Sequence, residues 1–167
     1  MSSKTMTFAN SKTETFFERH AWKVLLFFGL FMTLIGLPDL LTGGSYYKGG
    51  GASMLQGITG MTWEQLEATS PNAAAMIDFK VRMGGVQYIF LGLFSIAIAL
   101  TGFRRGERWA WYTMWLFPLF FASHSLVILS AYNHLEAGIP APLVSGPVVL
   151  VVTALTLVLS YRKFFSK

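Results

Sequence analysis

Apolar residues fall into four long runs along the chain, separated by shorter polar or glycine-rich segments. The runs cover residues 22–41, 83–103, 109–132 and 143–161. The second run contains no charged residue, and as a helix rising about 1.5 Å per residue it can cross a hydrocarbon layer of about 30 Å. The pattern predicts an all-α protein, a four-helix transmembrane bundle that forms one integral membrane domain over residues 1–167.

Composition agrees with a membrane location. Hydrophobic residues make up 53% of the 167 and charged residues only 13%, too few to cover a soluble domain of this size. The formal net charge of +5 comes from basic residues beside the apolar runs, so we expect lipid headgroups rather than nucleic acid as their partners. The chain has no cysteine, which excludes disulfides, thiolate metal sites and thiol redox chemistry.

Basic residues are distributed unequally between the segments that join the runs. If both termini are cytoplasmic, ten of the thirteen Lys and Arg residues lie on that side, and only Lys48, Lys80 and Arg82 lie outside. Because basic residues concentrate in cytoplasmic segments, this distribution predicts an N-in, C-in topology.

The outer segment, residues 43–82, begins with a glycine-rich loop over residues 43–70. Its glycines require positive-φ turns or mobility. Thr62 and Gln65 match a capping box, which predicts a short interfacial helix between the first two runs, with Trp63 and Leu66 on the membrane surface. Ser70 as a capping residue, followed by proline, predicts the start of the helix that carries the second run.

Small residues recur at helical spacing in three of the runs. In lipid such residues let two helices approach closely, so they mark expected helix-packing faces. They are Gly29 and Gly36 in the first run, Gly85 and Gly92 in the second, and Thr153 and Thr156 in the fourth. In the third run, Pro118 removes a backbone hydrogen bond and predicts a kink.

Four polar residues lie toward the predicted outer side, beneath the loop: Asp39, Asp78, Arg82 and His124. Asp78 and Arg82 are four residues apart, so a salt bridge within one helix is the simplest role for them. Asp39 fits a cap or ion pair at a helix end, and His124 fits a neutral hydrogen-bonding group between helices. If the four side chains converge, they form a polar pocket in which a carboxylate beside an imidazole can carry out acid–base chemistry.

Known catalytic and metal-binding patterns are absent from the sequence. It contains no HxxxH, no HExxH and no second inward-facing acid to complete a metal site. We therefore predict no catalytic residue, no metal and no cofactor, with a bound lipid or quinone as the alternative. Whether the protein is an enzyme stays open, and a non-enzyme is favoured.

A basic turn joins the second and third runs. Arg104, Arg105 and Arg108 are expected to anchor the cytoplasmic side, with Glu107 forming an ion pair inside the turn, or to bind an anionic lipid or an acidic loop of a partner. The stretch from TGF through RRGERWAW into the following span resembles an uncharacterised family of small four-span prokaryotic integral membrane proteins, over roughly residues 55–130. The resemblance implies the topology and a prokaryotic inner, cytoplasmic membrane, but no activity, cofactor or substrate.

The small-residue faces and the lack of a catalytic pattern favour a non-catalytic integral membrane protein. It would be an accessory or stabilising subunit of a larger membrane protein complex, or would associate with itself. The alternative is a small lipid- or quinone-binding membrane enzyme with a polar site at the outer leaflet. A small transporter is a weaker alternative, because the sequence shows no inverted repeat and no continuous stripe of ionisable residues. Expected partners are membrane lipids and other membrane subunits.

Overall fold

The computed structural model describes residues 15–166, and every regular element in that range is helical. Four segments are long and apolar enough to cross a membrane. The prediction of an all-helical protein with four segments of membrane-spanning length is therefore confirmed. The elements are α1 (Phe16–Thr42), η1 (Gly43–Lys48), α2 (Ala52–Thr59), α3 (Trp63–Thr69), α4 (Pro71–Ile98), η2 (Ala99–Phe103), α5 (Arg108–Met114), α6 (Leu116–Ala131), η3 (Leu135–Ala137) and α7 (Ala141–Phe165).

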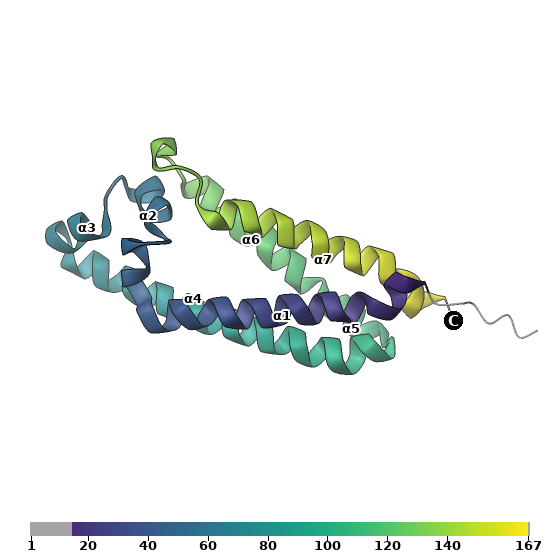
Figure 1. The fold of residues 1–167 in the computed structure, drawn as a ribbon. Helices are drawn as coiled ribbons and strands as arrows, with labels where there is room; N and C mark the ends of the chain where they lie inside the picture. The colour runs from purple at the N-terminus through teal and green to yellow at the C-terminus, as the bar shows by residue number, and fades with distance from the viewer. Residues whose placement is uncertain (1–14, 167) are drawn as a thin grey trace, which may run out of the picture.

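The long helices pack as two antiparallel pairs, α1 with α4 and α6 with α7 (Figure 1). The pairs meet at the end of the bundle where α1 begins, α7 ends and α5 lies. They diverge toward the opposite end, where η1, α2 and α3 lie.

Glycines hold α1 and α4 in backbone contact. A Cβ built on Gly36 would lie 2.5 Å from the carbonyl oxygen of Gly85, and one built on Gly29 would lie 3.0 Å from that of Gly92. Neither gap accommodates a methyl group without a shift of backbone. The small-residue faces expected on the first and second spans are thus the two sides of a single contact.

The small and hydroxylated face of α7 points into the bundle. Thr153 and Thr156 are 0% and 4% exposed, and their hydroxyls donate to carbonyls of the same helix, at 2.6 Å to Val149 and 2.7 Å to Val152. A hydroxyl satisfied in this way allows close packing without leaving a buried donor unpaired.

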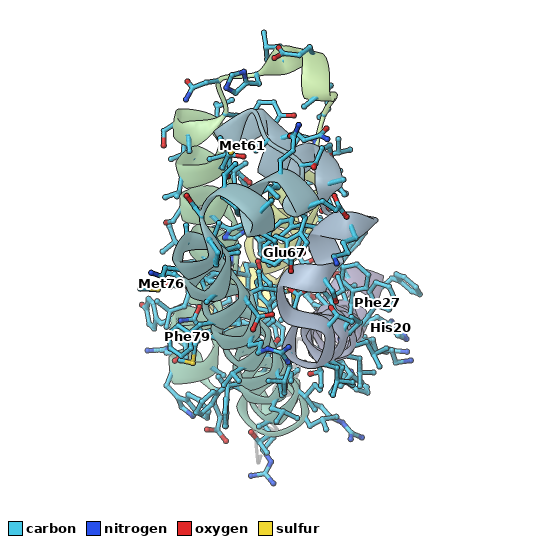
Figure 2. The ribbon with its side chains drawn as sticks, turned by 90° about the vertical axis from the view of Figure 1, so that its left-hand side faces the viewer. His20, Phe27, Met61, Glu67, Met76 and Phe79 are labelled. Atoms are coloured by element: carbon cyan, nitrogen blue, oxygen red, sulfur yellow. The ribbon has the colours of Figure 1, made fainter. Side chains whose placement is uncertain are left out.

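The outward faces of the long helices are apolar. Figure 2, which looks onto the end covered by α2 and α3, shows Phe27 of α1 and Phe79 of α4 projecting away from the bundle. Their side chains are exposed, as are many Leu and Val side chains of α6 and α7. Such a surface suits hydrocarbon rather than water.

The helix boundaries differ from the expected spans at several points. Helix α1 begins at Phe16, where Thr15 and Glu18 form a capping box, and α7 continues to Phe165. The third span breaks between α5 and α6 at Trp115, one turn before Pro118, because proline has no N–H to donate to the carbonyl of Met114. The helix is thus interrupted at the position where the proline predicts a kink.

Predictions for the outer segment were partly wrong. The capping box of Thr62 and Gln65 is formed, but Trp63 and Leu66 are 4% and 7% exposed and pack in one cluster with Leu55, so they do not lie on the membrane surface. The hydroxyl of Ser70 makes no capping bond to α4. Helix α2 was not predicted, because the glycines around and within it indicate a loop.

The α1–α4 contact predicts opposite effects for two adjacent glycines of α4. In Gly85→Ala the new Cβ would lie 2.5 Å from the backbone nitrogen of Leu40, whereas nothing lies within 4 Å of a Cβ on Gly84. We expect Gly85→Ala to destabilise the protein by about 1–3 kcal/mol through overpacking, and the matched Gly84→Ala to leave stability unchanged or raise it, since alanine favours helix. Thermal unfolding in detergent measures both; equal midpoints would contradict the contact.

Candidate functional site

A cavity of about 650 Å³ lies between the two helix pairs, lined by residues near the end of α1 and the start of α7. Helices α1, α4, α6 and α7 form its walls, and residues of η1 and α2 line it as well, including Tyr46, Tyr47 and Leu55. We call it the interhelical cavity. Its volume falls within the range of roughly 300–1,000 Å³ that is usual for small-molecule sites.

Most of the cavity wall is apolar. Met32 of α1, Phe121 of α6 and Val149 of α7 line it and are themselves largely buried in one hydrophobic cluster. Phe31 and Ile35 of α1 extend the apolar wall by one turn. A hydrocarbon chain would meet only apolar side chains along this part of the wall.

One hydrogen bond joins the two helix pairs at the cavity wall. The hydroxyl of Tyr88 on α4 lies 3.1 Å from Nε2 of His124 on α6. The imidazole also stacks on Phe120, with ring centroids 5.8 Å apart and an interplanar angle of 15°. Within residues 15–166, Nδ1 of His124 has no hydrogen-bond partner, so this atom is available to a bound molecule. The role expected for His124, a hydrogen bond between helices, is present.

Two charged side chains line the same cavity from neighbouring helices, Asp39 of α1 and Lys80 of α4. Asp39 follows Pro38 in the last turn of its helix and is partly buried, whereas Lys80 is exposed. In the part of the chain that the structure describes, neither side chain forms an ion pair or a hydrogen bond. Both charges can therefore be offered to a polar head group.

Asp78 and Arg82 lie outside the set of residues that lines the cavity and bind each other. Nε of Arg82 is 2.9 Å from Oδ2 of Asp78, which is the salt bridge expected from their spacing. The guanidinium also donates to the carbonyl of Leu40 at 2.9 Å, and the carboxylate accepts from the N–H of Gly44 at 2.7 Å. Since the last carbonyls of a helix have no partner within it, the pair caps α1 and fixes the turn into η1 against α4.

The structure thus divides the four residues expected in the outer polar pocket. Asp39 and His124 line one cavity, while Asp78 and Arg82 hold the chain beside it. Sequence reasoning missed Tyr88, although a tyrosine inside an apolar run requires a partner for its hydroxyl. It also missed Tyr46 and Tyr47 of η1, because the glycines around them indicate an irregular loop and not a helical turn.

The basic turn makes contacts that differ from those expected. Arg104 lies over the ring of Trp22, 5.1 Å from its centroid, and Arg108 donates from Nε to the carbonyl of Phe164 at 3.2 Å. Glu107 accepts a hydrogen bond from the indole of Trp109. The ion pair expected inside the turn is not formed among the described residues.

Comparisons with protein-family models, with curated proteins and with solved structures found no match. The class of the protein therefore follows from its own geometry. It is an all-helical chain with four segments of membrane-spanning length and a largely apolar cavity between two helix pairs. The resemblance of the RRGERWAW turn to a family of four-span proteins stays a prediction.

The capping role of Asp78 can be tested with Asp78→Asn. This variant replaces the carboxylate by a neutral amide, which loses the ion pair with Arg82 and leaves a weaker acceptor for the N–H of Gly44, so we expect faster amide hydrogen exchange in η1. Hydrogen exchange of the protein in detergent micelles, read by mass spectrometry over residues 43–48, measures this.

The matched control is Glu67→Gln. It removes the pair between Lys48 and Glu67, in which both side chains are 48% exposed and the charged atoms are 3.5 Å apart. Exposed pairs contribute little, so exchange in η1 should not change in this variant. Identical exchange in Asp78→Asn and the unaltered protein would show that the carboxylate does not hold the turn.

Proposed function

We propose that this protein is an integral membrane protein that binds one amphiphilic, lipid-soluble molecule, a lipid or a quinone, in the interhelical cavity. The cavity itself carries the proposal: about 650 Å³ of space with a mainly apolar wall and a few polar side chains. Sites for small molecules have this composition, in which the apolar wall supplies contact area and a few polar groups fix the orientation.

The apolar wall fits a hydrocarbon chain. Between protein and lipid the hydrophobic effect adds little, because both are apolar, so retention of a chain depends on the number of atomic contacts that it makes. Met32, Phe121 and Val149 supply these contacts from three helices. A molecule bound there replaces membrane lipid only if its shape fits this wall.

The polar side chains fit a head group that carries oxygen. A quinone or ester carbonyl can accept a hydrogen bond from the hydroxyl of Tyr88 or from the ring of His124. Lys80 and Asp39 add one positive and one negative group to the same wall. Asp39 and His124 form no hydrogen bond with each other among the described residues, so the proposal is one of binding and includes no reaction.

The subunit hypothesis has less support from the structure than from the sequence. It was based on the small-residue faces of the helices, and the structure uses Gly29, Gly36, Gly85 and Gly92 within the chain, between α1 and α4. These faces are therefore not available to another subunit. A role as an accessory subunit of a membrane complex stays a prediction.

We also propose an N-in, C-in topology in the cytoplasmic membrane of a prokaryote. Ten of the thirteen Lys and Arg residues fall on the cytoplasmic side in this arrangement. The start of α1 and the end of α7 lie at the same end of the bundle, as an even number of spans requires (Figure 1). In this orientation the interhelical cavity lies in the outer half of the membrane.

The proposal is tested by the molecules that co-purify with the protein from its membrane in a mild detergent. Mass spectrometry of the extract gives the amount of each lipid and quinone per protein. Tyr88→Phe removes one hydroxyl from the cavity wall, and the loss of one hydrogen bond, about 0.5–1.5 kcal/mol, should lower the retained amount about two- to tenfold. Tyr112→Phe is the matched control, because Tyr112 is exposed on α5 and lies outside the cavity.

A second variant tests the space rather than the hydrogen bond. Gly84 lines the cavity, and nothing lies within 4 Å of a Cβ built on it, so Gly84→Leu should place a side chain into the cavity without disturbing the helix contacts. We expect this variant to lose the retained molecule while keeping its thermal stability. Full retention in both Tyr88→Phe and Gly84→Leu would exclude the cavity as the binding site.

A further inference from the structure

A second, smaller hollow of about 380 Å³ lies at the opposite end of the bundle, near the start of α1 and the end of α7. Three parts of the chain contribute to it: the start of α1, the turn after η2 and the end of α7. We call it the basic hollow. Its main lining residues are Arg19, Trp22, Lys23, Arg104, Arg105 and Lys163.

Four cations of the basic hollow have no acidic partner among the described residues: Arg19, Lys23, Arg104 and Arg105. No carboxylate is among its lining residues. The acid that precedes Arg19 in the chain, Glu18, accepts from the N–H of Thr15 at 2.7 Å and is only 7% exposed. Among residues 15–166, an anion in the hollow would therefore meet several cations and no lining carboxylate.

Trp22 brings two of these cations together. The guanidinium of Arg104 lies 5.1 Å from the centroid of its ring, and Nζ of Lys23 lies 5.8 Å away. Both distances allow a cation–π interaction, which orders the two side chains against one indole. Residues that merely anchor the positive side of a membrane protein need no such convergence from separate helices.

We propose that the basic hollow binds the phosphate group of an anionic phospholipid. Arginine and lysine are the side chains that bind phosphate, and a basic pocket between membrane helices is a suitable lipid headgroup site. The hollow lies at one end of α1, where Trp22 and the exposed rings of Phe16 and Phe17 mark the depth of an interface. A lipid bound there can lay its acyl chains along the apolar outer faces of the helices. This site is separate from the interhelical cavity and does not depend on its proposed function.

The experiment is native mass spectrometry of the full-length protein in a neutral detergent, with equal amounts of phosphatidylglycerol and phosphatidylcholine added. We expect preferential binding of phosphatidylglycerol. Lys23→Gln and Arg105→Gln should each lower its affinity about fivefold, the effect of one basic residue near a membrane surface. Both side chains are exposed, so neither change should affect folding.

Two controls test whether lipid binding depends on the basic hollow, rather than on the overall positive charge of the protein or on the interhelical cavity. Arg162→Gln removes an exposed charge from the end of α7 without touching the hollow, and Tyr88→Phe removes a hydroxyl from the cavity wall, which shares no lining residue with the hollow. Neither should change the affinity for phosphatidylglycerol at this site. An equal loss in Arg162→Gln, or equal binding of the two lipids by the unaltered protein, would overturn the proposal.

A final arm distinguishes a lipid headgroup from free phosphate. Inorganic phosphate is added to the lipid-bound protein up to a large excess over the lipid. A headgroup site should retain phosphatidylglycerol, because the acyl chains add contacts that phosphate lacks. Displacement by inorganic phosphate at a concentration similar to that of the lipid would assign the hollow to a water-soluble anion and overturn the lipid proposal.

Discussion

The backbone contact between α1 and α4 is the constraint on which the rest of the structure depends. In lipid there is no hydrophobic drive to bring helices together, so close packing must supply the stability, and glycine permits the closest approach. Gly29 meets Gly92 and Gly36 meets Gly85, two backbone contacts that lie about two helical turns apart. Among the described residues, the α6–α7 pair makes no comparable glycine contact with this unit, and it meets the unit mainly at the end near α5 (Figure 1). The interhelical cavity lies between the two pairs.

At the end where the helix pairs diverge, polar interactions rather than close backbone packing hold the elements together. The hydrogen bond between Tyr88 and His124 crosses from one helix pair to the other, and the salt bridge of Asp78 with Arg82 fixes the turn from α1 into η1. Each of these groups has a partner within the protein, which lets polar side chains lie close to a membrane interior. The cavity is therefore bounded by ordered groups, and its remaining polar atoms can be offered to a ligand.

The two ends of the bundle have different chemistry because different packing forms them. Near the basic hollow the helices pack around a buried cluster that includes Leu25, Phe103 and Phe164. The space inside is filled, so the site at this end is formed by charged side chains at the surface. At the other end the cavity walls are mostly apolar and the space extends inward between the helices. An amphiphile with a long apolar part suits the cavity, whereas the hollow suits an anion.

The sequence by itself determined the features that depend on neighbours within about one helical turn or on composition over a span. These are the four apolar segments, the capping box of Thr62 and Gln65, the salt bridge of Asp78 with Arg82, and the small-residue faces. Only the tertiary structure decided which side chains meet across helices. Whether His124 faces Tyr88, and whether Asp39 lines the same cavity, depends on how each helix is rotated about its axis. That rotation is set by packing between residues far apart in the chain, which no local pattern encodes.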